Sequence, residues 1–293
     1  MYELIQLGRN TYYIECTSRI GIYKLDEKNI CVIDTGDDIA ASEALLKYMR
    51  QNNWTLKMVL NTHSHADHIA GNAILTERTG CKCYCAGIET VFIEHPFLEP
   101  SFIYGADPFD AIETKVYIAQ PTHAYELTPE VIPQGFEALR LDGHTFAMTA
   151  FKTPDDVWFL GDAVVSSGVL KKYHLTFLVD VAKYLDSLDI VEKLSGKLFV
   201  PAHAKPKEDI RPLVQENRDN TLEIIDLIYD LCKFPHSQEE LQRDIFRRYE
   251  RHMSVPQYVL TGSIIRTYLS YMRDVGKIEY LIEDNMVIWK SVR

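Results

Sequence analysis

The sequence has no long run of apolar residues. No uninterrupted apolar segment in the 293 residues approaches the ~20 residues that a membrane-spanning helix needs. Residues 1–6 also lack the basic stretch and following apolar segment that are typical of a secretion signal. We therefore expect a cytoplasmic protein that has no membrane partner.

Cysteine is scarce, and its spacing does not indicate a disulfide framework. Three of the six cysteines, Cys81, Cys83 and Cys85, alternate along a short segment, so they would share one face of a strand. A cysteine metal site would need a second cysteine pair nearby, and the sequence has none there. We interpret these three residues, and the other three cysteines, as small apolar residues of the core.

Positive charge is also in short supply. The formal net charge is −11, and residues 1–235 carry 22 Lys and Arg against 34 Asp and Glu. Residues 236–293 carry 9 basic and 8 acidic residues. Because nucleic-acid binding depends on Lys and Arg that neutralise phosphates, this balance disfavours a nucleic-acid partner.

The chain does contain a dense cluster of metal-type side chains. The sequence HSHADH at residues 63–68 places His63, His65 and His68 beside Asp67. Imidazole and carboxylate groups suit zinc, and also iron or manganese. A histidine-rich polar loop is the alternative interpretation. The position of the run, after a predicted buried strand and before a predicted helix, favours a metal site.

Further metal-type residues directly follow other apolar segments. They are His144 after residues 138–142, Asp162 after 157–160, His203 after 197–200, and Asp34 after 30–33. Side chains at strand ends gather into sites in layered α/β folds, because the strand is rigid and the loop beyond it varies. We therefore expect these residues to meet the cluster at 63–68.

Seven of these residues, in this order, resemble the signature of the metallo-β-lactamase superfamily. They are His63, His65, Asp67, His68, His144, Asp162 and His203. The resemblance runs from about residue 2 to residue 203 and is to the glyoxalase II-like and lactonase-like branch. It implies an α/β fold, a four-layer αββα sandwich of two facing sheets with helices outside. It says little about the substrate, because this superfamily hosts many chemistries.

The resemblance also implies two divalent metal ions, zinc or else iron or manganese. His63, His65 and His144 would hold one ion; Asp67, His68 and His203 would hold the other; Asp162 would bridge them. The pair would lower the pKa of a shared water, so that a bridging hydroxide attacks a carbonyl carbon. Asp67 is then both a ligand and a catalytic residue.

Periodicity predicts the organisation of residues 1–235, which we assign to the catalytic domain. Strands are expected at 11–16, 20–25, 30–34 and 58–61, and helices at 38–51, 69–79 and 179–194. Residues 87–136 contain six prolines and look irregular. Three later strands are expected to reach Asp162.

Residues 236–293 form a second, winged-helix-like module in this interpretation. After a helix at 210–232, helical patterns cover 238–249 and 261–275, and two strands cover 277–283 and 286–289. The later helical pattern has an apolar stripe that must be buried, made of Ile264, Ile265, Tyr268, Leu269 and Met272. We expect the module to pack beside the mouth of the site or, in a homodimer, against a partner subunit, rather than to read DNA.

Residues outside the ligand set are candidates for lining the pocket. His174 is the preferred catalytic candidate, because it follows the loop of Asp162. The other candidates are His95, His123, Tyr104, Tyr117 and Tyr173. Asp34 would orient a ligand histidine through its ring N–H, or would merely form a turn.

Comparison with related families narrows the chemistry. His65 stands where diiron flavoproteins have glutamate, and the late His203 favours two metals over the single iron of persulfide dioxygenases. Nothing after Asp162 matches the basic glutathione-binding pattern of a true glyoxalase II. The segment 145–147 also departs from the Gly/Pro-rich form usual after the histidine that precedes it.

We therefore predict a dinuclear-metal hydrolase that takes a small-molecule ester, thioester or lactone. A metal-dependent phosphodiesterase or ribonuclease is the alternative enzyme, and the charge disfavours it. A DNA- or protein-binding module on an inactive scaffold is the non-enzymatic alternative. A scaffold of that kind has no physical need for seven metal-type residues.

Overall fold

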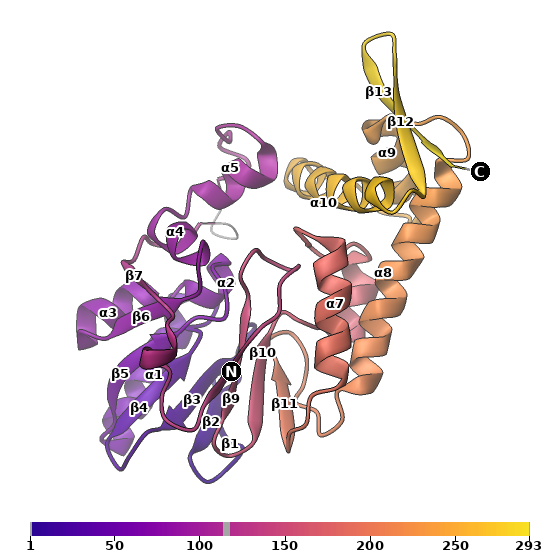
Figure 1. Cartoon of the computed structure of the whole chain (residues 1–293). Helices are drawn as coiled ribbons and strands as arrows, with labels where there is room; N and C mark the ends of the chain where they lie inside the picture. The colour runs from indigo at the N-terminus through magenta and orange to yellow at the C-terminus, as the bar shows by residue number, and fades with distance from the viewer. Residues whose placement is uncertain (1, 114–117, 293) are drawn as a thin grey trace.

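Two β-sheets face each other in the computed structural model, which describes residues 2–113 and 118–292 (Figure 1). The larger sheet has the order β1-β2-β3-β4-β5-β6-β7, with antiparallel pairing from β1 to β4 and parallel pairing from β4 to β7. Its strands are β1 (Leu4–Gln6), β2 (Thr11–Ile14), β3 (Ile20–Lys24), β4 (Asn29–Ile33), β5 (Thr55–Leu60), β6 (Lys82–Cys85) and β7 (Ala124–Glu126). The smaller sheet has the order β11-β10-β9-β8. Its strands are β8 (Glu137–Arg140), β9 (Thr149–Thr153), β10 (Val157–Gly161) and β11 (Leu198–Pro201).

Alternating side chains of the strands build separate cores on the two faces of each sheet. In β4, Ile30 and Val32 pack toward α1 (Ile39–Asn52), whereas Cys31 and Ile33 pack between the sheets. The smaller sheet packs its outer face against α7 (Val181–Glu192) and α8 (Arg211–Leu231). The predicted αββα sandwich is confirmed (Figure 1).

The helix predicted at 69–79 is wrong in one respect, because the structure has two helices there. They are α2 (Ala66–Ile69) and α3 (Asn72–Thr79), separated at Gly71. A Cβ on Gly71 would lie 1.9 Å from Ser42 Oγ, and the Gly71 amide donates to Thr35 Oγ1 at 3.1 Å. The close approach to the chain after β4 ends the first helix.

Residues 87–136 contain more regular structure than the prolines indicated. The described part includes α4 (Glu89–Glu94), α5 (Leu98–Tyr104), β7 and a 3-10 turn, η1 (Pro129–Val131). Tyr117 lies outside the described residues. The cysteines fulfil the prediction, since Cys81, Cys83 and Cys85 are free and buried.

The C-terminal segment has the two helices and the hairpin that were predicted, but the second helix begins at Val255, after the Ser254 cap, and not at residue 261. They are α9 (Gln238–Arg248), α10 (Val255–Asp274), β12 (Ile278–Glu283) and β13 (Met286–Ser291). Every residue of the predicted apolar stripe of α10 is buried. In Figure 1, α10 extends across one end of the sandwich from the α7 and α8 side toward α5, and the hairpin projects away.

The apolar stripe of α10 belongs to the same core as the smaller sheet. Ile264 and Tyr268 share one cluster of buried residues with Leu160 and Leu188. Arg266 also donates to the Ile103 carbonyl of α5 at 3.3 Å. The C-terminal segment therefore packs on the sandwich, and a division into two domains after residue 235 stays a prediction. Within the described residues, none of the helices is both long and apolar enough to cross a membrane.

Truncation of Tyr268 tests whether α10 and the sandwich unfold as one unit. Tyr268→Ala removes a fully buried ring from the shared core, so we expect the free energy of unfolding to fall by about 3–5 kcal/mol in a single transition. Tyr258→Ala on the same helix is the control, because this ring is 45% exposed and its loss should cost less than about 1 kcal/mol. Urea unfolding followed by circular dichroism measures both. A separate early transition confined to the C-terminal helices would contradict the shared core.

Candidate metal centre

The predicted metal-type residues come together at one end of the two sheets. His63 and His65 follow β5, Asp67 and His68 belong to α2, His144 lies between β8 and β9, Asp162 follows β10, and His203 follows β11. Two groups of donor atoms form, each with all its atoms within 4.8 Å of one another. One group is His63, His65, His144 and Asp162, and the other is Asp67, His68 and His203.

Asp162 lies between the two groups. Its Oδ1 is 3.3 Å from His68 Nε2, and its Oδ2 is 3.4 Å from His203 Nε2 and 3.5 Å from His144 Nε2. The second group closes through Asp67 Oδ2, which lies 3.1 Å from His203 Nε2. One carboxylate therefore reaches histidines of both groups, as a bridging ligand would have to.

The backbone before Asp162 explains how the carboxylate reaches this position. Gly161 has a φ of +52°, and a Cβ there would lie 3.0 Å from Thr62 Cβ. Only glycine combines this left-handed conformation with so close a contact. The pairing of β10 with β11 also shifts its register between Phe159 and Gly161, which turns the strand end toward the site.

Hydrogen bonds on the far side of the rings orient the histidines of β5 and α2. Thr62 Oγ1 donates to Asp34 Oδ2 at 2.7 Å, so its lone pairs are left to accept from His63 Nδ1 at 3.0 Å. His68 Nδ1 lies 2.8 Å from the same Asp34 oxygen. Both Nδ1 atoms carry the proton in this arrangement, which leaves both Nε2 lone pairs facing the cluster. The expectation that Asp34 contacts a histidine of the predicted ligand set is confirmed.

The other two histidines of the first group are oriented from different elements. His144 Nδ1 donates to the Phe177 carbonyl at 3.0 Å, which leaves Nε2 facing the cluster. His65 Nδ1 lies 3.1 Å from that Nε2, while His65 Nε2 points toward Glu99 of α5 at 3.8 Å. His65 therefore faces the cluster with Nδ1, unlike His63 and His144.

Burial and crowding perturb the pKa values of these groups in opposite directions. Burial lowers the pKa of His63 well below its ordinary value and that of His65 to about 3. The Asp162 carboxylate raises the pKa of His203 to about 10. Burial would lower the pKa of His68, but the carboxylates around it raise it well above its ordinary value. The carboxylates of the site thus favour positive charge at His68 and His203.

The donor set fits divalent cations. The Nε2 atoms of His63 and His68 and the Oδ1 atom of Asp162 are buried and have no hydrogen-bond partner. Buried polar atoms without partners are costly, and a cation would satisfy all three of them. Imidazole and carboxylate are ligands of zinc, iron and manganese, as the sequence indicated.

Glu89 of α4 is a supporting residue that the sequence did not reveal. Its buried carboxylate accepts from the amide and hydroxyl of Ser64 and from the Ala147 amide, the last at 2.8 Å. It thereby ties the loop of His63 and His65 to the loop of His144. The glutamate stands in a segment that looked irregular in the sequence, so only its packing identifies it.

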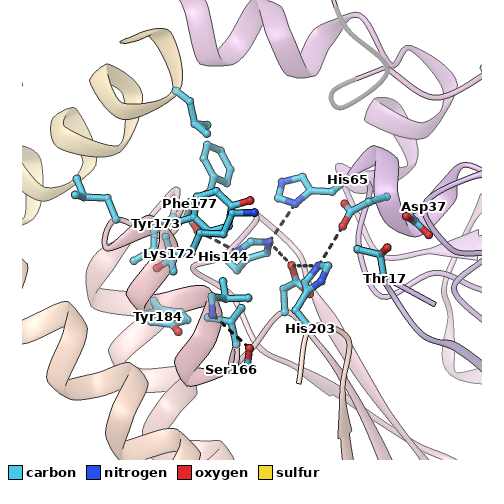
Figure 2. A pocket seen from close by; sticks show the side chains of 18 of the residues that line it. Thr17, Asp37, His65, His144, Ser166, Lys172, Tyr173, Phe177, Tyr184 and His203 are labelled. Carbon is cyan, nitrogen blue, oxygen red and sulfur yellow. Dashed lines mark hydrogen bonds and ion pairs between the residues drawn. The ribbon is translucent and has the colours of Figure 1, made fainter. Parts of the chain in front are cut away.

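A cavity of about 820 Å³ opens beside the cluster (Figure 2). Tyr173, a predicted pocket residue, lines it. His174 is not among its lining residues, because its ring stacks on Tyr249 with centroids 3.8 Å apart. The structure does not bring His174 to the metal-type residues, and its catalytic role stays a prediction.

The other pocket candidates that the structure describes also lie apart from this cavity. Tyr104 packs edge-on against Phe109, His95 against Phe97, and His123 pairs with Glu94. Tyr104, His95 and His123 are therefore not among the described residues that line the cavity.

Comparison with known proteins identifies the family. The model of the metallo-beta-lactamase superfamily matches residues 7–203. The chain belongs to this superfamily. Among solved structures, a beta-lactamase domain protein from Burkholderia ambifaria matches with a TM-score of 0.74 and 16% identity, over 99% of this chain and 94% of that one. A metallo-beta-lactamase family protein from Thermus thermophilus matches with a TM-score of 0.70 and 16% identity, over 99% and 97%. These two likenesses extend the shared fold through the C-terminal segment.

The curated relatives carry the names of hydrolases. A hydroxyacylglutathione hydrolase from Pelagibacter ubique is 26% identical over 75% of this chain and 84% of its own length. The hydroxyacylglutathione hydrolase GloC of Haemophilus influenzae is 27% identical over 49% of this chain. The chain spans 65% of the length of that relative, and 53% of a further hydroxyacylglutathione hydrolase from Hyphomonas neptunium.

Removal of the Glu89 carboxylate should weaken metal binding. Glu89→Ala leaves the Ser64 and Ala147 amides without their acceptor and loosens both ligand loops, so we expect metal affinity to fall about 10–100-fold. Competition with a chromophoric chelator measures it. Glu126→Ala is the matched control, because its carboxylate holds only the exposed Gly87 amide. Equal metal affinities for the two variants would show that Glu89 does not support the site.

Proposed function

We propose that the protein is a metal-dependent hydrolase that holds two divalent cations and cleaves a small ester, thioester or lactone. The observation that carries this proposal is the pair of adjacent donor groups that share Asp162 at the wall of a large cavity. The hydrolase names of the curated relatives support the same reaction type.

The residues divide the work as follows. His63, His65 and His144 would hold one cation, and Asp67, His68 and His203 the other, with Asp162 between them. When bound, the cations supply Lewis acidity and lower the pKa of a water beside the cavity.

The chain fixes this arrangement before any substrate arrives. Asp34 and Thr62 hold the tautomers of His63 and His68. Ser18 donates to Asp67 Oδ2 at 2.7 Å, which holds that carboxylate toward His203. Such preorganisation matters because reorienting a side chain during the reaction costs free energy, and a side chain that is already oriented avoids that cost.

The reaction requires no nucleophile from the protein. A water oxygen forms the new bond to the carbonyl carbon, and the bond from that carbon to the leaving oxygen or sulfur breaks. The electron pair of the broken bond, and one proton of the water, end on the leaving group.

The charge of the cavity favours carbonyl substrates over phosphodiesters. Outside the ligand set, Asp37 and Glu99 line it, whereas Lys172 is the one Lys or Arg among its described lining residues. Phosphate diesters are bound mainly by clustered Lys and Arg, which this cavity does not offer. The relatives' names point to a glutathione thioester, but Lys172 is the one Lys or Arg that the described lining offers to so charged a leaving group.

The number of metal ions can be measured directly. We expect elemental analysis of protein purified without chelators to find two divalent ions per chain, with zinc as the first candidate. Asp162→Ala should lower the occupancy, because this carboxylate contacts histidines of both groups. One ion per chain, together with full occupancy in Asp162→Ala, would rule out the dinuclear site.

Replacement of single ligands should abolish hydrolysis but not folding. His63→Ala and Asp67→Ala remove donors at the end of the sheets, away from the apolar cores, so turnover should fall at least ~10³-fold while the far-UV circular dichroism stays unchanged. Thioester, lactone and phosphodiester substrates are assayed on metal-loaded protein. Wild-type turnover in Asp67→Ala would contradict the mechanism. Preferential cleavage of phosphodiesters would contradict the proposed substrate class.

A further inference from the structure

The cavity beside the metal centre has two unlike sides. Figure 2 shows Phe177, Tyr173 and Lys172 on one side of His144, and Thr17 and Asp37 beyond His203 on the other. A ligand that spans the cluster would therefore meet chemically different groups at its two ends.

The side near Phe177 is built from apolar side chains of separate elements. Val165 and Val169 come from α6 (Ser167–Tyr173) and the loop before it, and Leu175 comes from the loop after it. Ile103 comes from α5 and Leu260 from α10. Three segments far apart in the sequence thus place aliphatic groups around one space.

These apolar residues are not simply a part of the core. Val169, Leu175 and Leu260 are only half-buried, although each faces the cavity. Leu260 packs both on the core of the smaller sheet and on a small cluster of Ile103, Ile112 and Val259. An apolar, partly solvated concave surface of this kind gains free energy when an apolar ligand displaces its water.

The charges around the cavity also favour an apolar ligand on the side near Phe177. Lys172 is exposed and at the rim, so the interior of this side offers no fixed cation to a multiply charged group. The polar side near Thr17 adds Asp37, which would repel an anionic leaving group.

We propose that this side of the cavity is an acyl-chain subsite, formed jointly by α5, α6 and the C-terminal helix α10, for esters or thioesters of medium-length apolar acids with an uncharged leaving group. The inference rests on the proposed hydrolase function and makes its substrate class specific. The carbonyl lies at the metal centre, the apolar chain extends toward Leu260, and the leaving group lies near Thr17. In hydrolysis of such a thioester, water supplies the oxygen of the carboxylic acid product, and the leaving sulfur takes the electron pair and a proton.

The test uses thioesters of N-acetylcysteamine, whose leaving group is uncharged, with acyl chains from acetyl to octanoyl. Each buried methylene raises kcat/KM by up to about fourfold, so we expect octanoyl to exceed acetyl by at least tenfold in the metal-loaded full chain. Leu260→Trp and Val169→Trp fill the subsite from two elements. Each should lower the octanoyl-to-acetyl ratio of kcat/KM at least fivefold.

A matched variant separates filling of the subsite from a general effect of tryptophan. Val255 lies on the same helix as Leu260, but its side chain is 50% exposed and outside the cavity. The octanoyl-to-acetyl ratio of Val255→Trp should therefore equal that of the wild type. Val169→Trp serves if Leu260→Trp fails to fold, because Val169 lies on a different helix. A flat chain-length profile in the wild type, or wild-type ratios in both filled variants, would overturn the subsite.

A binding measurement distinguishes failure of the subsite from failure of the hydrolase function. Calorimetry compares the S-octyl and S-ethyl thioethers of N-acetylcysteamine, which cannot be hydrolysed. We expect the octyl compound to bind at least tenfold more tightly to the wild type and to lose this advantage in the filled variants. Octyl preference without turnover of any ester, thioester or lactone would contradict the proposed function and support the subsite. Turnover without tighter binding of the octyl compound would support the proposed function and contradict the subsite.

Discussion

The metal centre depends on the hydrogen bonds that Asp34 makes behind the histidine rings. One Asp34 oxygen contacts both Thr62 Oγ1 and His68 Nδ1, and Thr62 in turn accepts from His63. The other oxygen accepts from the Thr62 amide at 2.7 Å. A single carboxylate therefore fixes a backbone segment and two ring tautomers. Its φ of +56° places Asp34 in the left-handed region, so the turn after β4 holds backbone strain at the point where the site is organised.

The remainder of the fold brings other elements to this fixed point. The parallel order of β4, β5 and β6 places the Asp34 and His63 loops side by side, and the second sheet brings Asp162 and His203 from the opposite face. Helices α4 and α5, from the segment between β6 and β7 of the larger sheet, add Glu89 behind the loops and Glu99 beside His65. The C-terminal helix α10 completes the cavity wall while sharing the core of the smaller sheet. One segment thus contributes both to the stability of the sandwich and to the shape of the site.

The ligand set could be predicted from the sequence for a physical reason. Four of its members lie within one run of six residues, and the others follow apolar strands whose ends must meet at one edge. Glu89 and Glu99 could not be predicted in this way, because both stand in a proline-rich segment that looks irregular in the sequence and become buried only through the packing of α4 and α5. His174 shows that nearness in the sequence to a ligand does not by itself place a side chain in the cavity. It is near Asp162 in the sequence, but α6 intervenes, and the residue caps that helix with a φ of +58° and its ring against Tyr249.

The central claim is that two cations share Asp162 in this site, and anomalous diffraction from crystals grown with zinc tests it most directly. Data collected on the two sides of the zinc absorption edge reveal each ion without assumptions about activity. The account predicts two anomalous peaks, one among His63, His65 and His144 and the other at Asp67, His68 and His203, both in contact with Asp162. A single peak, or peaks that leave Asp162 without a metal contact, would contradict it.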